Sequence, residues 1–160
     1  GTHTAHLLIS VMGNEKDPVG AAKLLTALAA SVLPQPEVLG IYTSGTVFQP
    51  EFYLKVAQDL KAGDLPVMDW VYVGLYRGKK GACGYTYGLS SFGREEMEII
   101  DSAKEPGEVM EFLYDLCIYL LKSDAYIRDG ETVGHSVEEK LSVTRSKGVA
   151  LDGMTLKIAF

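Results

Sequence analysis

The chain has 160 residues, of which 47% are hydrophobic and 22% are charged, and its formal net charge is −6. This balance is ordinary for a folded globular protein and argues against intrinsic disorder. The 15 Lys and Arg residues are scattered and outnumbered by 21 Asp and Glu, whereas nucleic acids and anionic membranes attract clustered basic side chains. We therefore expect neither a nucleic acid nor a membrane as partner.

Cysteine content and hydropathy favour the cytoplasm. Cys83 and Cys117 are the only cysteines, and they form no dense framework of the kind that secreted domains use, so we expect two free thiols. The longest apolar stretch, residues 19–33, contains Lys23 and is too short to span a bilayer. The chain begins at Gly1 rather than Met, which is compatible with a fragment of a longer protein, and its length predicts a single domain over residues 1–160.

The first part of the chain predicts the order strand, helix, strand, helix. Residues 3–12 alternate in a way that predicts a strand. Asp17-Pro18 predicts a helix start, because Asp can cap free backbone amides and Pro suits the first helical position, and Pro34 predicts its end. A short strand over residues 38–43 and a second helix from Pro50 to Gly63 follow.

The middle of the chain predicts antiparallel strands and one long helix. Residues 69–77 alternate, and the turn from Gly78 to Gly81 predicts a hairpin into residues 82–87. Residues 96–99 predict a further short strand. The firmest helix is predicted over residues 106–122, where the apolar positions follow helical spacing and acidic residues lie near the start.

The last third predicts further β-structure, since Asp129-Gly130 and Asp152-Gly153 both suit hairpin turns that require a positive φ. The whole pattern predicts an α+β fold with a mixed, mostly antiparallel sheet, about three helices packed on it and a β-rich C-terminal end. The predicted core consists of Leu7, Ile9, Leu24, Leu28, Val56, Val71, Val73, Phe112, Leu116, Leu156 and Ile158.

The most distinctive stretch is residues 84–93, which reads Gly-Tyr-Thr-Tyr-Gly-Leu-Ser-Ser-Phe-Gly. Its glycines would let a ligand approach the backbone, and hydroxyl groups to bind it would come from Tyr85, Thr86, Tyr87 and Ser90. The stretch matches neither a phosphate-binding loop, nor the dinucleotide fingerprint, nor a nucleophile elbow. A strand that ends in a structurally required tight turn explains the same residues, and we favour that interpretation.

Two glutamates and the histidines are the remaining candidates for chemistry. Glu96 and Glu98 would share a strand face, where they could hold a cation or act in acid–base catalysis, although a solvated strand face explains them more simply. His135 could join them in an enzyme site. His3 and His6 would point to opposite faces of a strand, which is a poor geometry for a shared metal. We therefore predict no metal and no cofactor.

Several segments together resemble a known family. These are residues 85–99, Tyr-Thr-Tyr-Gly-Leu-Ser-Ser-Phe-Gly-Arg-Glu-Glu-Met-Glu-Ile, then residues 129–134, Asp-Gly-Glu-Thr-Val-Gly, and the closing stretch 141–158. They resemble the bacterial family known as domain of unknown function 4261, with the N-terminal half more loosely similar. The resemblance implies that the Gly-Leu-x-x-Phe-Gly turn and the Gly-Glu-Thr-Val-Gly loop belong to a shared architecture. It implies no catalytic residue.

These observations predict a non-catalytic interaction or binding domain of the bacterial cytoplasm, which contacts a protein partner or associates with itself. The reason is that a well-formed apolar pattern is accompanied by no recognisable nucleophile, metal or phosphate motif. The alternative is a small-molecule enzyme with a site near the turn of residues 84–93 and Glu96 and Glu98. A toxin-neutralising role, as small acidic bacterial proteins can have, is a third hypothesis.

Overall fold

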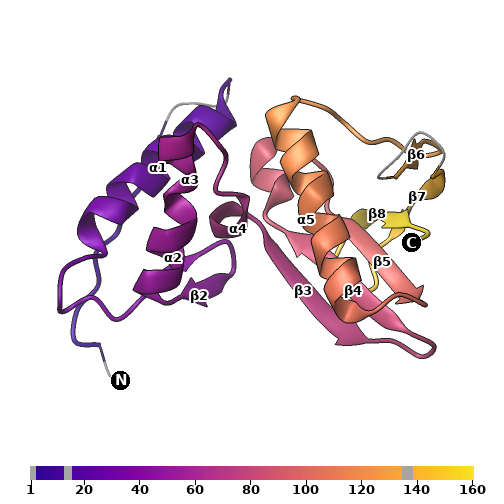
Figure 1. Ribbon diagram of the computed structural model, residues 1–160, viewed down its shortest axis with the longest axis horizontal. Helices are drawn as coiled ribbons and strands as arrows, with labels where there is room; N and C mark the ends of the chain where they lie inside the picture. Colours follow the sequence, from indigo (N-terminus) through magenta and orange to yellow (C-terminus); the bar gives the residue numbers. More distant parts are fainter. Residues whose placement is uncertain (1–2, 13–15, 135–138) are drawn as a thin grey trace. The chain divides into compact units, whose positions relative to one another are not determined.

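The computed structural model describes residues 3–12, 16–134 and 139–160, and the chain forms two compact units, residues 1–70 and 71–160 (Figure 1). The first unit contains α1 (Pro18–Val32), β1 (Ile41–Thr43), β2 (Thr46–Phe48), α2 (Pro50–Ala57), α3 (Asp59–Ala62) and α4 (Val67–Trp70). The second contains β3 (Tyr72–Arg77), β4 (Ala82–Tyr87), the 3-10 helix η1 (Leu89–Phe92), β5 (Met97–Ser102), α5 (Pro106–Lys122), β6 (Thr132–Val133), β7 (Leu141–Lys147) and β8 (Met154–Ile158).

The helices of the first unit begin and end at the predicted signals. The Asp17 carboxylate accepts a hydrogen bond from the Gly20 N–H at 2.7 Å, directly before α1. The predicted second helix is divided into α2 and α3, and the latter ends at Gly63, whose φ of 82° is the left-handed conformation that glycine adopts easily. The buried cluster of this unit consists of Ala29, Leu33, Tyr53 and Ala57, with Ile9, Ala30, Val38, Ile41, Phe48 and Leu54 packed against it.

A buried polar group joins three helices of this unit. The Thr26 hydroxyl of α1 accepts a hydrogen bond from the Trp70 indole Nε1–H of α4 at 2.8 Å, and the Tyr53 hydroxyl of α2 lies 3.5 Å away. Asp69, beside Trp70, is also buried, but neither of its carboxylate oxygens has a hydrogen-bond partner among the residues described. Burial, with a smaller contribution from Asp59, raises the pKa of Asp69 to about 8.

The prediction of a strand over residues 3–12 is wrong for this structure, because the segment forms neither a helix nor a strand and pairs with no strand in the described part of the chain. Leu7, predicted in the core, is exposed, while Ile9 is partly buried. Leu24 and Leu28 are also exposed, because α1 is apolar around much of its circumference and buries the side that carries Thr26 and Ala29 instead.

The second unit is built on a six-stranded sheet with the order β3-β4-β5-β8-β7-β6. Every neighbouring pair is antiparallel except β5 and β8, which are parallel. The predicted α+β class, with a mixed and mostly antiparallel sheet and a β-rich C-terminal end, is therefore confirmed. The predicted hairpin from Gly78 to Gly81 is confirmed too, with the Gly78 N–H bonded to the Gly81 carbonyl at 2.9 Å.

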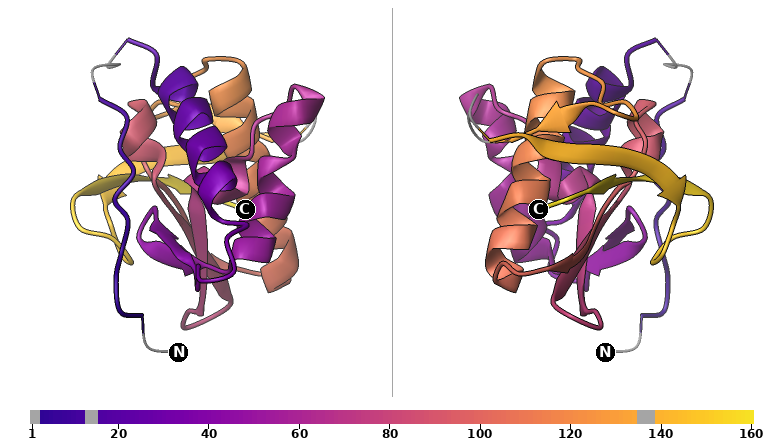
Figure 2. Two further views of the ribbon diagram at one scale, coloured as in Figure 1. Left: turned by 90° about the vertical axis from the view of Figure 1, so that its left-hand side faces the viewer. Right: turned by 90° about the vertical axis from the view of Figure 1, so that its right-hand side faces the viewer.

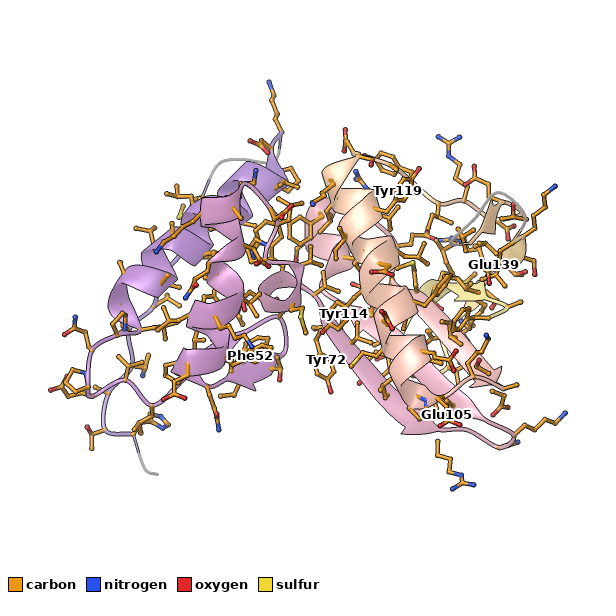
Figure 3. All side chains as sticks on the ribbon, viewed as in Figure 1. Phe52, Tyr72, Glu105, Tyr114, Tyr119 and Glu139 are labelled. Atoms are coloured by element: carbon orange, nitrogen blue, oxygen red, sulfur yellow. The ribbon has the colours of Figure 1, made fainter. Side chains whose placement is uncertain are left out.

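Helix α5 spans the predicted residues and lies along one face of this sheet, over β3 and β4 (Figure 2). It begins with a capping box at Glu105, whose N–H donates to the Glu108 carboxylate at 3.0 Å (Figure 3). Gly84 of β4 allows a close approach, because a Cβ there would lie 2.8 Å from Val109 and 2.9 Å from Leu113. The predicted core residues Val71, Val73, Phe112, Leu116, Leu156 and Ile158 are all buried, and Val56 of the first unit is partly buried.

The C-terminal turns differ from each other. The turn at Asp152-Gly153 lies within the loop between the paired strands β7 and β8, as predicted. Asp129-Gly130 also forms a turn, with a φ of 80° at Gly130, but it precedes β6 and does not join two paired strands. Both cysteines are buried and free, as predicted. None of the helices in the described ranges is long and apolar enough to cross a membrane.

The buried Asp69 carboxyl predicts an unusual pH dependence of stability. Its pKa is about 8 in the folded chain and 3.8 for an ordinary Asp carboxyl group. Folding therefore takes up a proton between these pH values, and stability falls as the pH rises from about 4 to about 8. Asp69→Asn should remove this slope and raise the free energy of unfolding at pH 8 by about 2–4 kcal/mol. Urea unfolding at several pH values measures the free energy of unfolding and its pH slope.

The exposed Glu37→Gln variant is the matched control, because it removes one carboxyl group from the same unit and Glu37 does not contribute to the raised pKa of Asp69. Its pH dependence should stay close to that of the unaltered chain. An unchanged pH slope in Asp69→Asn would show that Asp69 does not titrate as described.

Candidate functional site

The predicted turn after β4 is organised around the carboxylate of Glu96. Its Oε2 accepts a hydrogen bond from the Thr86 hydroxyl at 2.8 Å, and its Oε1 accepts from the backbone N–H groups of Gly88 at 2.9 Å and Ser90 at 3.1 Å. The Thr86 hydroxyl in turn accepts a hydrogen bond from the Met97 N–H at 2.8 Å. This Glu96 network therefore joins the end of β4, the start of η1 and the start of β5.

Glu98 is the centre of a second network on β5, and its side chain is completely buried. Its oxygens accept hydrogen bonds from three consecutive backbone N–H groups, those of Val149, Ala150 and Leu151, at distances between 2.9 and 3.2 Å. The Thr155 hydroxyl lies 3.2 Å from Oε2, and the Lys157 ammonium forms an ion pair with the same oxygen at 2.7 Å. The Glu98 network fixes the loop between β7 and β8.

The electrostatics of Glu98 agree with this role. Burial alone would raise the pKa of this carboxyl group. Hydrogen bonds from Lys157 and from the backbone N–H groups of Val149 and Ala150 outweigh that effect and hold the pKa of Glu98 below its usual range. Glu98 is thus a charged group at neutral pH whose oxygens are directed at protein donors, and it is a poor proton acceptor for a substrate.

The two glutamates do not form one site. Glu96 precedes β5 and binds the turn of residues 88–90, whereas Glu98 lies in β5 and binds the loop of residues 149–151. Of the other candidates, Thr86 and Ser90 belong to the Glu96 network. His135 lies outside the described residues, so the prediction that it joins the two glutamates stays a prediction.

The two tyrosines occupy the strand β4 beside these networks. Tyr85 is the register partner of Glu98 on one side and of Gly74 on the other. Its ring lies across Gly74, where a Cβ would come within 2.3 Å of it, and it meets the Tyr72 ring edge-on at 6.2 Å. Tyr87 is exposed at the end of the strand. The structure therefore packs Tyr85 against β3 and leaves Tyr87 open to solvent.

Sequence reasoning missed a third polar network, which is centred on Arg94. This nearly buried guanidinium group donates from Nε to the Ala125 carbonyl at 2.7 Å and from Nη1 to the Phe92 carbonyl at 3.0 Å. It also pairs with Asp124 at 2.5 Å and lies 3.6 Å from the centre of the Tyr126 ring. Arg94 thus joins the turn after η1 to the chain that follows α5. The sequence signal that could have indicated this network is an arginine directly after a Phe-Gly turn.

Sequence reasoning also missed where the exposed apolar side chains of the first unit lie. Tyr42 of β1 and Val47 of β2 are register partners on the outer face of a two-stranded hairpin, and they are 74% and 71% exposed. In residues 3–12, Leu8 and Met12 are 84% and 87% exposed. We define the apolar surface as the six exposed side chains of Leu7, Leu8, Met12, Leu39, Tyr42 and Val47.

Within the described residues, no group of three or more His, Cys, Asp or Glu residues is arranged so that it could hold a metal ion. Glu96 and Glu98 each use their oxygens on protein donors instead.

Comparison with known protein families supports the resemblance. Residues 85–159 match the model of the family described as Domain of unknown function (DUF4261). No curated protein and no solved structure matches the chain. The resemblance inferred from the sequence is therefore confirmed for this range, which contains the three networks of Arg94, Glu96 and Glu98 and lies entirely in the second unit.

Loss of the Glu98 charge should strongly destabilise the fold. Glu98→Gln keeps the shape of the side chain but places an amide among several donors and leaves the Lys157 ammonium without its buried partner. The expected loss is about 2–4 kcal/mol in the free energy of unfolding. Chemical denaturation at pH 7 measures it. Glu95→Gln, which removes a partly exposed pair with Arg145, should cost less than about 1 kcal/mol, and equal effects would contradict the interpretation.

The Glu96 network gives a second stability prediction. Thr86→Val keeps the branched shape but removes a hydroxyl that donates to Glu96 and accepts from the Met97 N–H. Because these groups are buried, the variant should lose about 1–3 kcal/mol in the free energy of unfolding. Thr132→Val, at an exposed position of β6, should change it by less than about 0.5 kcal/mol. A Thr86→Val chain as stable as that control would exclude a stabilising role of the hydroxyl.

Proposed function

We propose that this chain is a non-catalytic binding domain that contacts a protein through the apolar surface of its first unit. The observation that carries the proposal is the exposure of Leu8, Met12, Tyr42 and Val47, each more than 70% open to solvent. Large apolar side chains that are exposed on one small unit favour an interaction site, because a contact that removes them from water is favourable.

The charge distribution supports a protein partner over the alternatives. The chain carries a net charge of −6, which disfavours the phosphate backbone of a nucleic acid. Residues 5–12 and 38–49 contain no Asp, Glu, Lys or Arg. A contact made there desolvates no charged side chain of these segments. The buried free thiols fit a reducing compartment, and we place the binding event in the bacterial cytoplasm.

The second unit supports the same proposal because its candidate catalytic carboxylates already bind protein groups. Glu96 and Glu98 are the residues best suited to acid–base chemistry. Their carboxylates accept hydrogen bonds from the turn and from the loop that they fix. A catalytic carboxylate needs an oxygen that a substrate can reach. The alternative of a small-molecule enzyme at the turn of residues 84–93 therefore has less support than a scaffold that stabilises itself and binds elsewhere.

A photo-crosslinking experiment in the native cells tests the proposal. Tyr42 on the apolar surface and Tyr119 on α5, the latter labelled in Figure 3, are both exposed. Each is replaced in turn by p-benzoylphenylalanine. Tyr42 should give a discrete covalent adduct with a protein, and Tyr119 should not. Val47→Asp, introduced beside Tyr42 on the same hairpin face, should abolish the adduct. Absence of any adduct from Tyr42, or equal adducts from both positions, would refute the proposal.

A further inference from the structure

We infer that α4 is a proton-controlled latch on the β1–β2 hairpin, which it holds while the buried Asp69 carboxyl group is protonated and releases when that group loses its proton. The regulatory consequence rests on the proposed function, since Tyr42 and Val47 of this hairpin belong to the apolar surface. Three features of the first unit carry the inference: a strained turn bonded to α4, a bond from α4 to α1, and a carboxyl group of α4 without donors.

The turn of the hairpin is the first feature. Ser44 and Gly45 form the turn between β1 and β2, and their φ angles are 48° and 74°. Two successive positive φ angles favour glycine, asparagine or aspartate at the first position, so Ser44 is an unfavourable residue there. Its hydroxyl donates a hydrogen bond to the Trp70 carbonyl of α4 at 2.7 Å. The turn therefore depends on α4 for a contact that offsets its strain.

The attachment of α4 to the helices is the second feature. The Trp70 indole Nε1–H donates to the Thr26 hydroxyl of α1 at 2.8 Å, and the Tyr53 hydroxyl of α2 lies 3.5 Å from the same oxygen. All three side chains are buried. Trp70 thus binds α1 through its indole and the hairpin turn through its carbonyl, so a displacement of α4 breaks both bonds.

The carboxyl group of Asp69 is the third feature. Asp69 precedes Trp70 in α4 and is 1% exposed, and neither of its oxygens has a hydrogen-bond partner among the described residues. A buried carboxylate without donors is strongly unfavourable, because nothing replaces the water that it loses. The group therefore keeps its proton as long as α4 stays packed, in agreement with its raised pKa. Ionisation is coupled to a movement of α4 that lets water reach the carboxylate.

The groups around Asp69 support this coupling. Burial is the main cause of its raised pKa, and the Asp59 carboxylate of α3 raises it further by repulsion. Tyr53 of α2 stays neutral where Asp69 ionises, because burial raises the pKa of its hydroxyl. The hairpin segment of residues 38–49 contains no Asp, Glu, Lys or Arg. The other charged residues of α1, α2 and α3 are all exposed, namely Lys23, Glu51, Lys55 and Lys61.

The direction of the response follows from the two pKa values of Asp69, 3.8 for an ordinary Asp and about 8 in the folded chain. Between them, each rise in pH favours the released state of α4, which has the ionised carboxylate in water. Release removes the Ser44 bond from a hairpin that pairs over only three residues in each strand, and such hairpins are marginally stable alone. Binding through Tyr42 and Val47 is therefore favoured at the lower pH.

The first test follows α4 by fluorescence of the full chain, since Trp70 is its only tryptophan. As the pH rises from about 4 to about 8, the emission maximum should shift to longer wavelength because the indole becomes exposed to water. Asp69→Asn should remove the shift, and Glu37→Gln should keep it. An emission maximum that stays constant in the unaltered chain, or that shifts equally in Asp69→Asn, would overturn the inference.

The second test asks whether the hairpin follows α4. Tyr42→4-fluorophenylalanine and, as the control on α5, Tyr119→4-fluorophenylalanine report by 19F NMR over the same pH range. The resonance at position 42 should move together with the Trp70 emission, and that at position 119 should not. Ser44→Gly keeps the turn, because glycine accepts a positive φ, but removes the bond to α4. It should abolish the response at position 42 and leave that of Trp70.

A response at position 42 that persists in Ser44→Gly would overturn the latch. Neither measurement needs the partner, so the latch and the proposed function can fail separately. A pH-independent hairpin that still crosslinks to a protein from Tyr42 overturns the latch and leaves the proposed function standing. A working latch without any adduct from Tyr42 refutes the proposed function alone.

Discussion

The fold of the second unit depends on a carboxylate that is completely removed from water. Burying an ionised group is costly unless opposite charge and hydrogen bonds replace the water that it loses. Glu98 meets this condition with three consecutive N–H groups of residues 149–151, the Thr155 hydroxyl and the Lys157 ammonium. The constraint is reciprocal, because the N–H groups of that loop need an acceptor as much as the carboxylate needs donors. The β7–β8 loop and the central strand β5 therefore stabilise each other through one side chain.

The same principle is repeated at the other irregular segments of this unit. Glu96 satisfies the N–H groups of the turn after β4, and Arg94 satisfies the carbonyls of Phe92 and Ala125 where the chain changes direction. Turns have backbone groups that no strand or helix can pair, so a charged side chain with several bonding sites is an efficient substitute. All three residues lie in the range that matches the family model. The bonds of these three charged residues are therefore explained by the architecture that they stabilise.

The regular elements were predictable from the sequence because their signals are local. Asp17-Pro18 and Gly63 mark helix ends through their own backbone preferences, and α5 follows its apolar spacing to the residue. The hydrogen-bond partners of Glu98 were not predictable, since they lie more than 50 positions away along the chain. The exposure of Leu24 and Leu28 was missed for another reason. A helix that is apolar on most sides can bury any of them, and the choice is made by tertiary contacts such as the Thr26–Trp70 bond.

The failed strand prediction for residues 3–12 is the most informative of these differences. The alternation that predicted a strand is a property of the sequence, whereas no strand among the described residues pairs with this segment. A sequence specifies a fold best when local and global preferences agree. In the second unit they agree at the hairpin of β3 and β4 and at α5. In the first unit they conflict at one segment, and that segment carries some of the most exposed apolar side chains of the protein. Alternation in the sequence is therefore not enough to make a strand, because a segment also needs a neighbouring strand edge with which its backbone can pair.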